Sequence, residues 1–382
     1  YQQQAEDFRS EYLDALPKDA NAVTAEYETA IPAARTAYKA LSKNVQSFIE
    51  KAEDNVALLR KRLRTPAMKV LDTTLGKYSE TSVKVLYLEN VADSALVDDV
   101  LRRLSEIKLD SVMDSGYIEQ FLTDGAPRLF IEVGNSEKPD KVAAKLAEGR
   151  VAIICDGSPV VLTVPYLFVE SLQSAEDYLK TPYYATFVRI VRFLSMLISL
   201  YLPAFYIAVM EHHKNAVPSG IYAAMTGARR DIPFSLFGEL VVILLIFEFI
   251  REVGVRMPGA VGDAVSIVGG LILGDAAISA GISSAPVIMV AALTAICTFI
   301  LPPYMNSAVL VRFMNLIAAR LFGVVGIAFA VTLLVVHLCG KTSFGVPYMK
   351  PFCPLSLAGL NDTLFMRPKK ALGNASRELE DS

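Results

Sequence analysis

The sequence predicts a mixed fold: a cytoplasmic α/β domain followed by an all-α polytopic membrane domain of four to six segments, with room for re-entrant ones. The first observation is composition, since 53% of the 382 residues are hydrophobic and the mean hydropathy is +0.39. The second is distribution, because mixed, charged sequence up to Lys180 gives way to long apolar runs near the ~20 residues that span a bilayer. The third is an alternation of strand and helix patterns over 66–165, typical of a layered domain.

These patterns divide the chain into four regions. They are a helical N-terminal segment (1–65), the cytoplasmic α/β domain with its linker (66–182), the membrane domain (183–340) and a cytoplasmic C-terminal tail (341–382).

Local patterns predict the elements of the α/β domain. Capping residues at Asp93-Ser94 and a stop at Gly149 bound two helices, and Asp156-Gly157 is a hairpin turn signal. The predicted helices are 45–64, 94–107, a short one after Ser115-Gly116, and 139–148; the predicted strands are 82–89, 129–133, 151–156 and 159–164.

Apolar runs predict the membrane segments, which are 193–210, 234–253, 260–284, 287–301 and 321–338. Arg189 and Arg192 precede the first run, so the soluble domain should face the cytoplasm. Basic residues after Lys341 place the tail on the same side, which requires an even number of crossings. Arg312 and Arg320 should mark a membrane interface before the last span.

The stretch 260–284 combines small residues with acids. Small residues suit helices packed closely on their neighbours, and a carboxylate at membrane depth is costly unless it faces protein or water. Asp275 and Asp263 are therefore candidates for an ion path, or else each pairs with Arg251, Arg256 or Arg312. The same two interpretations apply to the acids of the preceding run, Glu239, Glu248 and Glu252. The nearby glycines either allow close helix packing or line the ion path; they are Gly269, Gly270 and Gly274.

Enzyme and nucleic-acid functions find no support in the residues. The net charge of −3 is too weak to suggest nucleic acid, and no nucleophile motif is present. His212-His213 lacks a second ligand pair, and the four cysteines share no CxxC spacing, so we expect no metal, no cofactor and no catalytic residue.

Several long strings carry a resemblance to a known family. They are DNVALLRKRLRTPAMKV, KLAEGRVAIICDGSPVVLTVP, DYLKTPYYATFVRIVRFLSMLISLYLPAFYIAVM, FEFIREVGVRMPGAVGDAVSIVGGLILGDAAISAGI and KTSFGVPYMKPFCPLSLAGLNDTLFMRP. Through them the chain resembles, over roughly residues 52 to 367, the A subunit of the GerA-type spore germination receptors or the close accessory-channel branch encoded with dipicolinate-release proteins.

The resemblance implies a multi-pass protein of the spore inner membrane, with both terminal regions on the cytoplasmic, spore-core side. It implies a B-type integral membrane subunit and a C-type lipoprotein subunit as partners, and self-association into a ring that conducts monovalent cations when nutrients bind. The resemblance makes 261–284 the conduit helix, and Arg251, Glu252 and Arg256 match the family's REAGxRxP-like stretch. These three residues and Arg312 are the candidates for a gating or structural role.

Some positions depart from the family pattern. Residues 1–45 differ from the usual N-terminal subdomain, and Asp275 stands where most members have Gln.

Two other functions remain open from the residues alone. One is a secondary solute transporter with helices broken near Gly269-Gly270, although no inverted repeat is found; the other is a non-conducting membrane scaffold or sensor of a germination complex.

Overall fold

A five-stranded antiparallel sheet forms the centre of the soluble domain in this computed structural model, which describes residues 47–123, 129–256, 274–355, 363 and 365–366. The strands are β1 (Met68–Leu75), β2 (Thr81–Leu88), β3 (Gly134–Ser136), β4 (Val151–Cys155) and β5 (Val161–Val164), in the order β1-β2-β4-β5-β3. β4 is buried along its whole length, because helices cover both faces of the sheet.

The helices flank the sheet in two pairs. α4 (Ser94–Glu106) and α5 (Ser115–Leu122) contribute to one apolar core, while α3 (Ala52–Arg62) and α6 (Pro139–Ala147) contribute to the other. Because α3 packs directly on the sheet, it belongs structurally with the α/β unit, although the sequence suggested a boundary at residue 65.

The predicted turn signals are confirmed. Asp93 caps α4 by accepting from the Ala95 amide at 2.9 Å, and Gly149 follows α6 with a φ of +88°. Asp156 and Gly157 turn β4 into β5, and they also anchor α3: the Asp156 carboxylate accepts from the Ala52 amide at 2.9 Å.

The strand prediction at 129–133 is wrong, and its reason lies far along the chain. Phe130 and Val133 are buried as expected, but pairing with β5 begins only at Gly134. The carbonyls of Ile131 and Glu132 accept instead from the Tyr348 hydroxyl (2.8 Å) and the Ser343 hydroxyl (3.0 Å) of the tail. The two edge strands of the sheet, β1 and β3, were not predicted.

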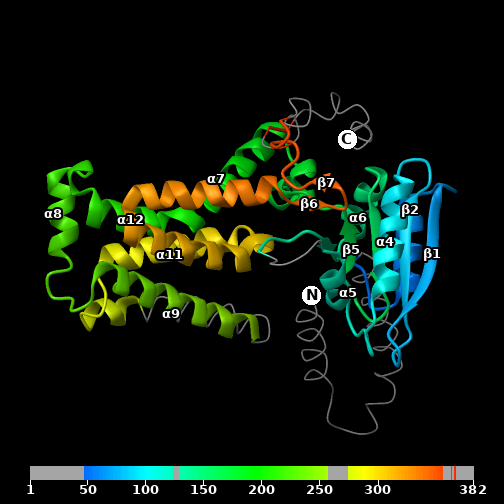
Figure 1. Cartoon of the computed structure of the whole chain (residues 1–382), viewed down its shortest axis with the longest axis horizontal. Coiled ribbons are helices and arrows are strands. Elements are labelled where there is room, and N and C mark those ends of the chain that lie inside the picture. Colours follow the sequence, from blue (N-terminus) through cyan, green and yellow to red (C-terminus); the bar gives the residue numbers. More distant parts are fainter. Residues whose placement is uncertain (1–46, 124–128, 257–273, 356–362, 364, 367–382) are drawn as a thin grey trace, which may run out of the picture.

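The helical domain extends away from the sheet (Figure 1). Its elements are α7 (Pro182–Ile207), the π-helical turn η3 (Ala208–His212), α8 (Ser219–Gly227), α9 (Leu236–Arg256), a helical turn over 274–279, α11 (Ala285–Phe299) and α12 (Met305–Cys339). Within the described part of the chain, two helical stretches are long and apolar enough to cross a membrane, Pro182–His212 and Pro302–Cys339.

α12 folds back on itself at Gly323, so it is a hairpin of two legs. Gly323 has non-helical backbone angles (φ 60°, ψ −139°), which glycine adopts without a steric penalty. A Cβ on Gly326 would lie only 2.1 Å from the carbonyl oxygen of Ala318, so the legs touch backbone to backbone. At 1.5 Å per residue each leg is about 25 Å long, close to the hydrocarbon thickness of a bilayer.

The hairpin differs from the predicted last span, 321–338, which runs through the bend. It brings both ends of α12 to the sheet side, where Tyr304 and Leu338 join one apolar cluster with Phe168 and Tyr348. Gly323 lies at the far end against the His212 side chain. The chain therefore enters and leaves the helical domain at the same end.

Candidate functional site

Arg312 lies at the point where four helices of the helical domain meet. Its guanidinium donates from Nε to the Ser199 carbonyl of α7 (2.9 Å) and from Nη2 to the Thr298 hydroxyl of α11 (2.5 Å). Nη1 donates to the Glu248 carboxylate of α9 at 3.3 Å. Arg312 is 1% exposed, so its charge is satisfied by the neighbouring helices, and its expected position at a membrane interface stays a prediction. The planar fork of an arginine suits one side chain that ties three other helices together.

Glu248 also pairs with Arg251, one turn further along α9, at 2.7 Å. The cluster of Arg312, Glu248 and Arg251 thus carries two positive charges against one negative charge. Arg251 Nη1 is buried and has no hydrogen-bond partner among the described residues. Buried ion pairs stabilise mainly by mutual compensation, so removing one member leaves the other charges exposed to a large desolvation penalty.

Glu239 forms a second buried centre at the end of the domain that is distant from the sheet. It is 1% exposed, and its carboxylate pairs with Arg229 at 2.8 Å. The same carboxylate accepts from the Ser284 amide (2.6 Å) and from the hydroxyls of Ser284 and Ser283. A carboxylate at the first residues of α11 complements the positive end of the helix dipole. Glu239 therefore joins the α8–α9 connection to the start of α11.

Asp275 differs from these buried acids because its side chain is exposed and forms no ion pair with another described residue. It lies in the helical turn beside Gly274 and Ala276. Glu252 and Arg256 pair with each other at 2.8 Å on the exposed end of α9. The remaining candidates, Asp263, Gly269 and Gly270, lie outside the described residues.

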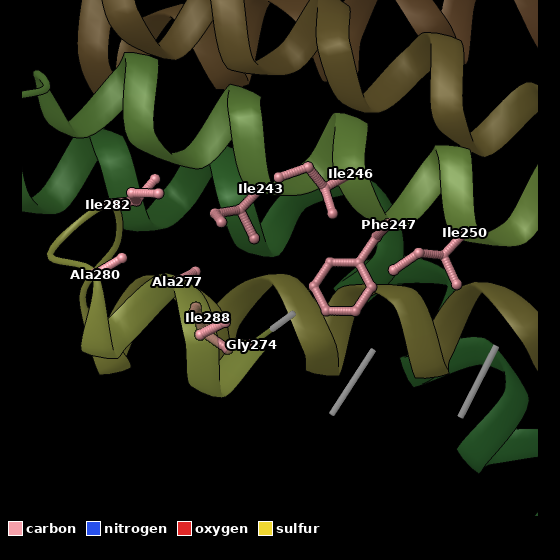
Figure 2. A pocket seen from close by; sticks show the side chains of 10 residues that line it. Ile243, Ile246, Phe247, Ile250, Gly274, Ala277, Ala280, Ile282 and Ile288 are labelled. Atoms are coloured by element: carbon pink, nitrogen blue, oxygen red, sulfur yellow. The ribbon is translucent and has the colours of Figure 1, made fainter. Parts of the chain in front are cut away.

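A cavity of about 220 Å³ separates the turn that carries Asp275 from α9. Figure 2 shows Ile243, Phe247 and Ile250 of α9 on one side and Gly274 and Ala277 on the other. The described side chains that line it are all apolar.

The sequence missed the ionic junction between the soluble domain and the first long helix. Asp177 is fully buried and accepts from Arg192 at 2.6 and 2.9 Å, while Arg189 Nε lies 3.4 Å away. Burial on its own would raise the pKa of Asp177, but the hydrogen bonds from Arg192 and the Ser174 amide, with the charges of both arginines, hold it below its usual value. The Ser174-x-x-Asp177 capping pattern ahead of α7 was the available signal.

A second junction follows α12. The hairpin of β6 (Thr342–Ser343) and β7 (Val346–Pro347) returns to the soluble domain, where Lys341 pairs with Glu132. At its turn Phe344 takes a left-handed conformation (φ 50°), and its ring lies 4.1 Å from the guanidinium carbon of Arg103 on α4. Both connections to the helical domain are thus fixed to the soluble domain by charged and aromatic contacts.

Comparisons with known proteins identify the family. A sequence model of the Bacillus/Clostridium GerA spore germination protein family matches residues 34–377. The chain is 40% identical over 325 residues to Spore germination protein KA of Bacillus subtilis (strain 168), covering 85% of this chain and 60% of that protein. It is 35% identical over 328 residues to Spore germination protein GerLA of Bacillus cereus, covering 85% and 67%.

Another relative is the Uncharacterized membrane protein YfkQ of Bacillus subtilis (strain 168), 37% identical over 326 residues, covering 85% of this chain and 63% of that protein. The chain thus spans about three fifths of the length of the relatives it matches best among these. Among solved structures it is similar to the N-terminal domain of the A subunit of the Bacillus megaterium spore germinant receptor GerK3, with 35% identity and a TM-score of 0.27, covering 32% of this chain and 97% of that domain. On the family match and these identities, the chain belongs to the Bacillus/Clostridium GerA family of spore germination proteins.

Proposed function

We propose that the chain is the A-type subunit of a nutrient-responsive germination receptor and that several copies form a gated cation channel in the spore inner membrane. The soluble domain and the tail would lie on the spore-core side, and a B-type membrane subunit and a C-type lipoprotein would complete the receptor. The family membership and the apolar helices support the receptor assignment.

One observation supports conduction in particular: Asp275 is an exposed carboxylate of the helical domain without an ion-pair partner among the described residues. At membrane depth such a group must meet water or another chain. The buried acids Glu239 and Glu248 do not share this property, because each is neutralised by arginine. Of the described acidic candidates, Asp275 is therefore the one that we assign to an ion path, and the two glutamates act as structural groups in this proposal.

The test is potassium release from spores after nutrient addition, with Asp275→Asn and Asp275→Glu compared. A cation about 4 Å from a carboxylate gains at least ~1 kcal/mol, so Asp275→Asn should slow release by about fivefold or more. Asp275→Glu keeps the charge and should release ions at nearly the normal rate. Equal release from all three proteins would remove Asp275 from the path.

A second experiment distinguishes the proposed channel from a non-conducting scaffold. If the chain forms a channel, the purified protein should form a ring by electron microscopy and produce cation currents in planar bilayers. A ring that never conducts, with or without its partner subunits, would favour the scaffold function, and a lone monomer would contradict the channel directly.

A further inference from the structure

Three lysines form one stripe along α6, on the side that faces the linker to α7. This linker carries the short helices η1 (Phe168–Leu172) and η2 (Ala175–Leu179). Lys138, Lys141 and Lys145 are three and four positions apart, a spacing that places their side chains on one side of a helix. The first pairs with Glu176 of the linker at 3.6 Å, and the last pairs with Glu170 of the linker at 3.0 Å. Lys141, between them, makes no hydrogen bond or ion pair with another residue in the part of the chain that the structure describes.

A cavity of about 200 Å³ lies at this middle lysine, between α6 and the linker. It is lined on the α6 side by Lys141 and Lys145, and on the linker side by Glu170, Gln173, Ser174 and Tyr178. The Ser174 hydroxyl accepts from the Glu176 amide at 3.4 Å, and its own hydrogen can be donated to a ligand. Pockets for drug-sized ligands begin at ~300 Å³, so this space suits a smaller molecule.

The other charges beside the cavity compensate one another. Glu170 is buried and pairs with Arg150 as well as with Lys145. Glu148, which also lines the cavity, pairs with the same two cations at 3.3 Å each. Asp140 borders the cavity as well, but it is exposed, so water and salt screen its charge.

The charge of Lys141 therefore remains without a compensating partner. Lys141 is half-buried, and burial, followed by the charge of Lys145, lowers the pKa of its ammonium group, while the charge of Glu170 opposes this shift. One anionic group in the cavity would compensate the ammonium. A second negative charge on the same ligand would instead face Glu148 and Glu170, whose cations are already engaged.

From this geometry we propose that the cavity is a binding site for a small organic molecule with a single carboxylate group. One carboxylate oxygen pairs with the Lys141 ammonium, and the Ser174 hydroxyl donates to the carboxylate from the opposite wall. The site is a charge-assisted contact with one cation and one hydroxyl, which suits a monoanion.

Such a ligand would join α6 to the start of the helical domain. Ser174 is the N-cap of η2, and its amide donates to the Asp177 carboxylate at 3.0 Å. Asp177 in turn accepts from Arg192 of α7 at 2.6 and 2.9 Å. Occupation of the cavity should therefore restrain the linker at the point where the soluble domain leads into α7. The inference does not depend on conduction.

The first experiment labels the lysines of the purified chain in detergent with an amine-reactive ester and measures each site by peptide mass mapping. The probe is acetate, titrated to about 100 mM because so small a ligand binds in the millimolar range. Acetamide is its uncharged match, and sodium chloride at equal concentration controls for ionic strength. Since only the free site reacts, labelling of Lys141 should slow by about tenfold at ten times the Kd of acetate. Acetamide and chloride should have no such effect, and the exposed Lys108 should label equally in all three.

A second readout is amide hydrogen exchange over 173–180. Acetate at ten times its Kd should slow this exchange by about tenfold in the unmodified chain. Lys141→Gln should abolish the response, and Lys141→Arg, which keeps the charge, should retain it. Lys138→Gln is the matched control, because Lys138 belongs to the same stripe but does not line the cavity, and it should respond like the unmodified chain.

Three results would overturn the proposal. Equal protection of Lys141 by acetate and chloride would mean that salt screening, and not a site, changes its reactivity. Protection by inorganic phosphate but not by acetate would mean that the cavity takes a different class of anion. A full response of the exchange over 173–180 in Lys141→Gln would mean that acetate binds elsewhere.

Discussion

The close contact between the two legs of α12 gives a prediction for Gly326→Ala. An added Cβ would lie 2.1 Å from the Ala318 carbonyl oxygen and 3.0 Å from the Phe322 Cβ. The first distance is more than 1 Å shorter than an ordinary carbon–oxygen contact, and backbone cannot rotate away as a side chain can. The legs must therefore separate or shift along each other.

We expect this substitution to destabilise the helical domain by about 1 to 2 kcal/mol, because overpacking of a well-packed core typically costs ~1 to 3 kcal/mol. Alanine's better helix propensity offsets at most ~1 kcal/mol of that strain. Gly220→Ala in α8 is the matched control, since nothing lies within 4 Å of its Cβ position. It should be neutral or slightly stabilising.

The assay follows thermal unfolding in detergent with a thiol-reactive dye, and peptide mass mapping measures the labelling of Cys297 separately from that of the other three cysteines. Cys297 on α11 is buried and becomes reactive when the helical domain opens. A melting temperature for Gly326→Ala that matches the unmodified protein, with a normal Gly220→Ala control, would refute the close packing of the hairpin.

Two further predictions concern the buried charges. A lysine at position 312 keeps the charge, but its single ammonium cannot bond to Ser199, Glu248 and Thr298 together. The same melting assay should therefore show that Arg312→Lys lowers the free energy of unfolding by about 2 to 4 kcal/mol, and that Arg312→Leu lowers it by at least as much. The folded-state pKa of Asp177 is depressed, so its pairing with Arg192 contributes stability above the unfolded pKa near 3.8, and this contribution is lost as the pH falls through the folded value. Asp177→Asn should therefore be less stable than the unmodified chain at pH 7, with the difference narrowing below about pH 4; a difference that is independent of pH in denaturation curves would contradict this.

Elements of the soluble domain that depend on local chemistry were predictable from the sequence. The Asp93 cap, the Gly149 stop and the Asp156-Gly157 turn each fix a backbone conformation through neighbouring residues, and each appears where predicted. The segment 129–133 has the side chains of a strand, but its backbone partners are Ser343 and Tyr348, about 210 residues away. No local pattern can report such partners.

The helical domain was less predictable because its apolar runs conceal the positions of bends. Residues 321–338 read as one uninterrupted span, yet Gly323 turns the chain within it. The pairing of Arg312 with Glu248 joins helices 64 residues apart, so the sequence indicated only that arginine and glutamate required partners. Asp263 and Asp275 were predicted together, but only Asp275 can be compared with the structure.

The capping of Ile131 and Glu132 by the tail has a consequence for biosynthesis. Residues 341–348 leave the ribosome after every described helix of the helical domain, so the soluble domain is synthesised before the residues whose hydroxyls bond to the Ile131 and Glu132 carbonyls. A nascent chain that stops at Cys339 would lack the bonds from Ser343 and Tyr348 to the soluble domain. The soluble domain can therefore acquire these contacts only after the described helices have been synthesised.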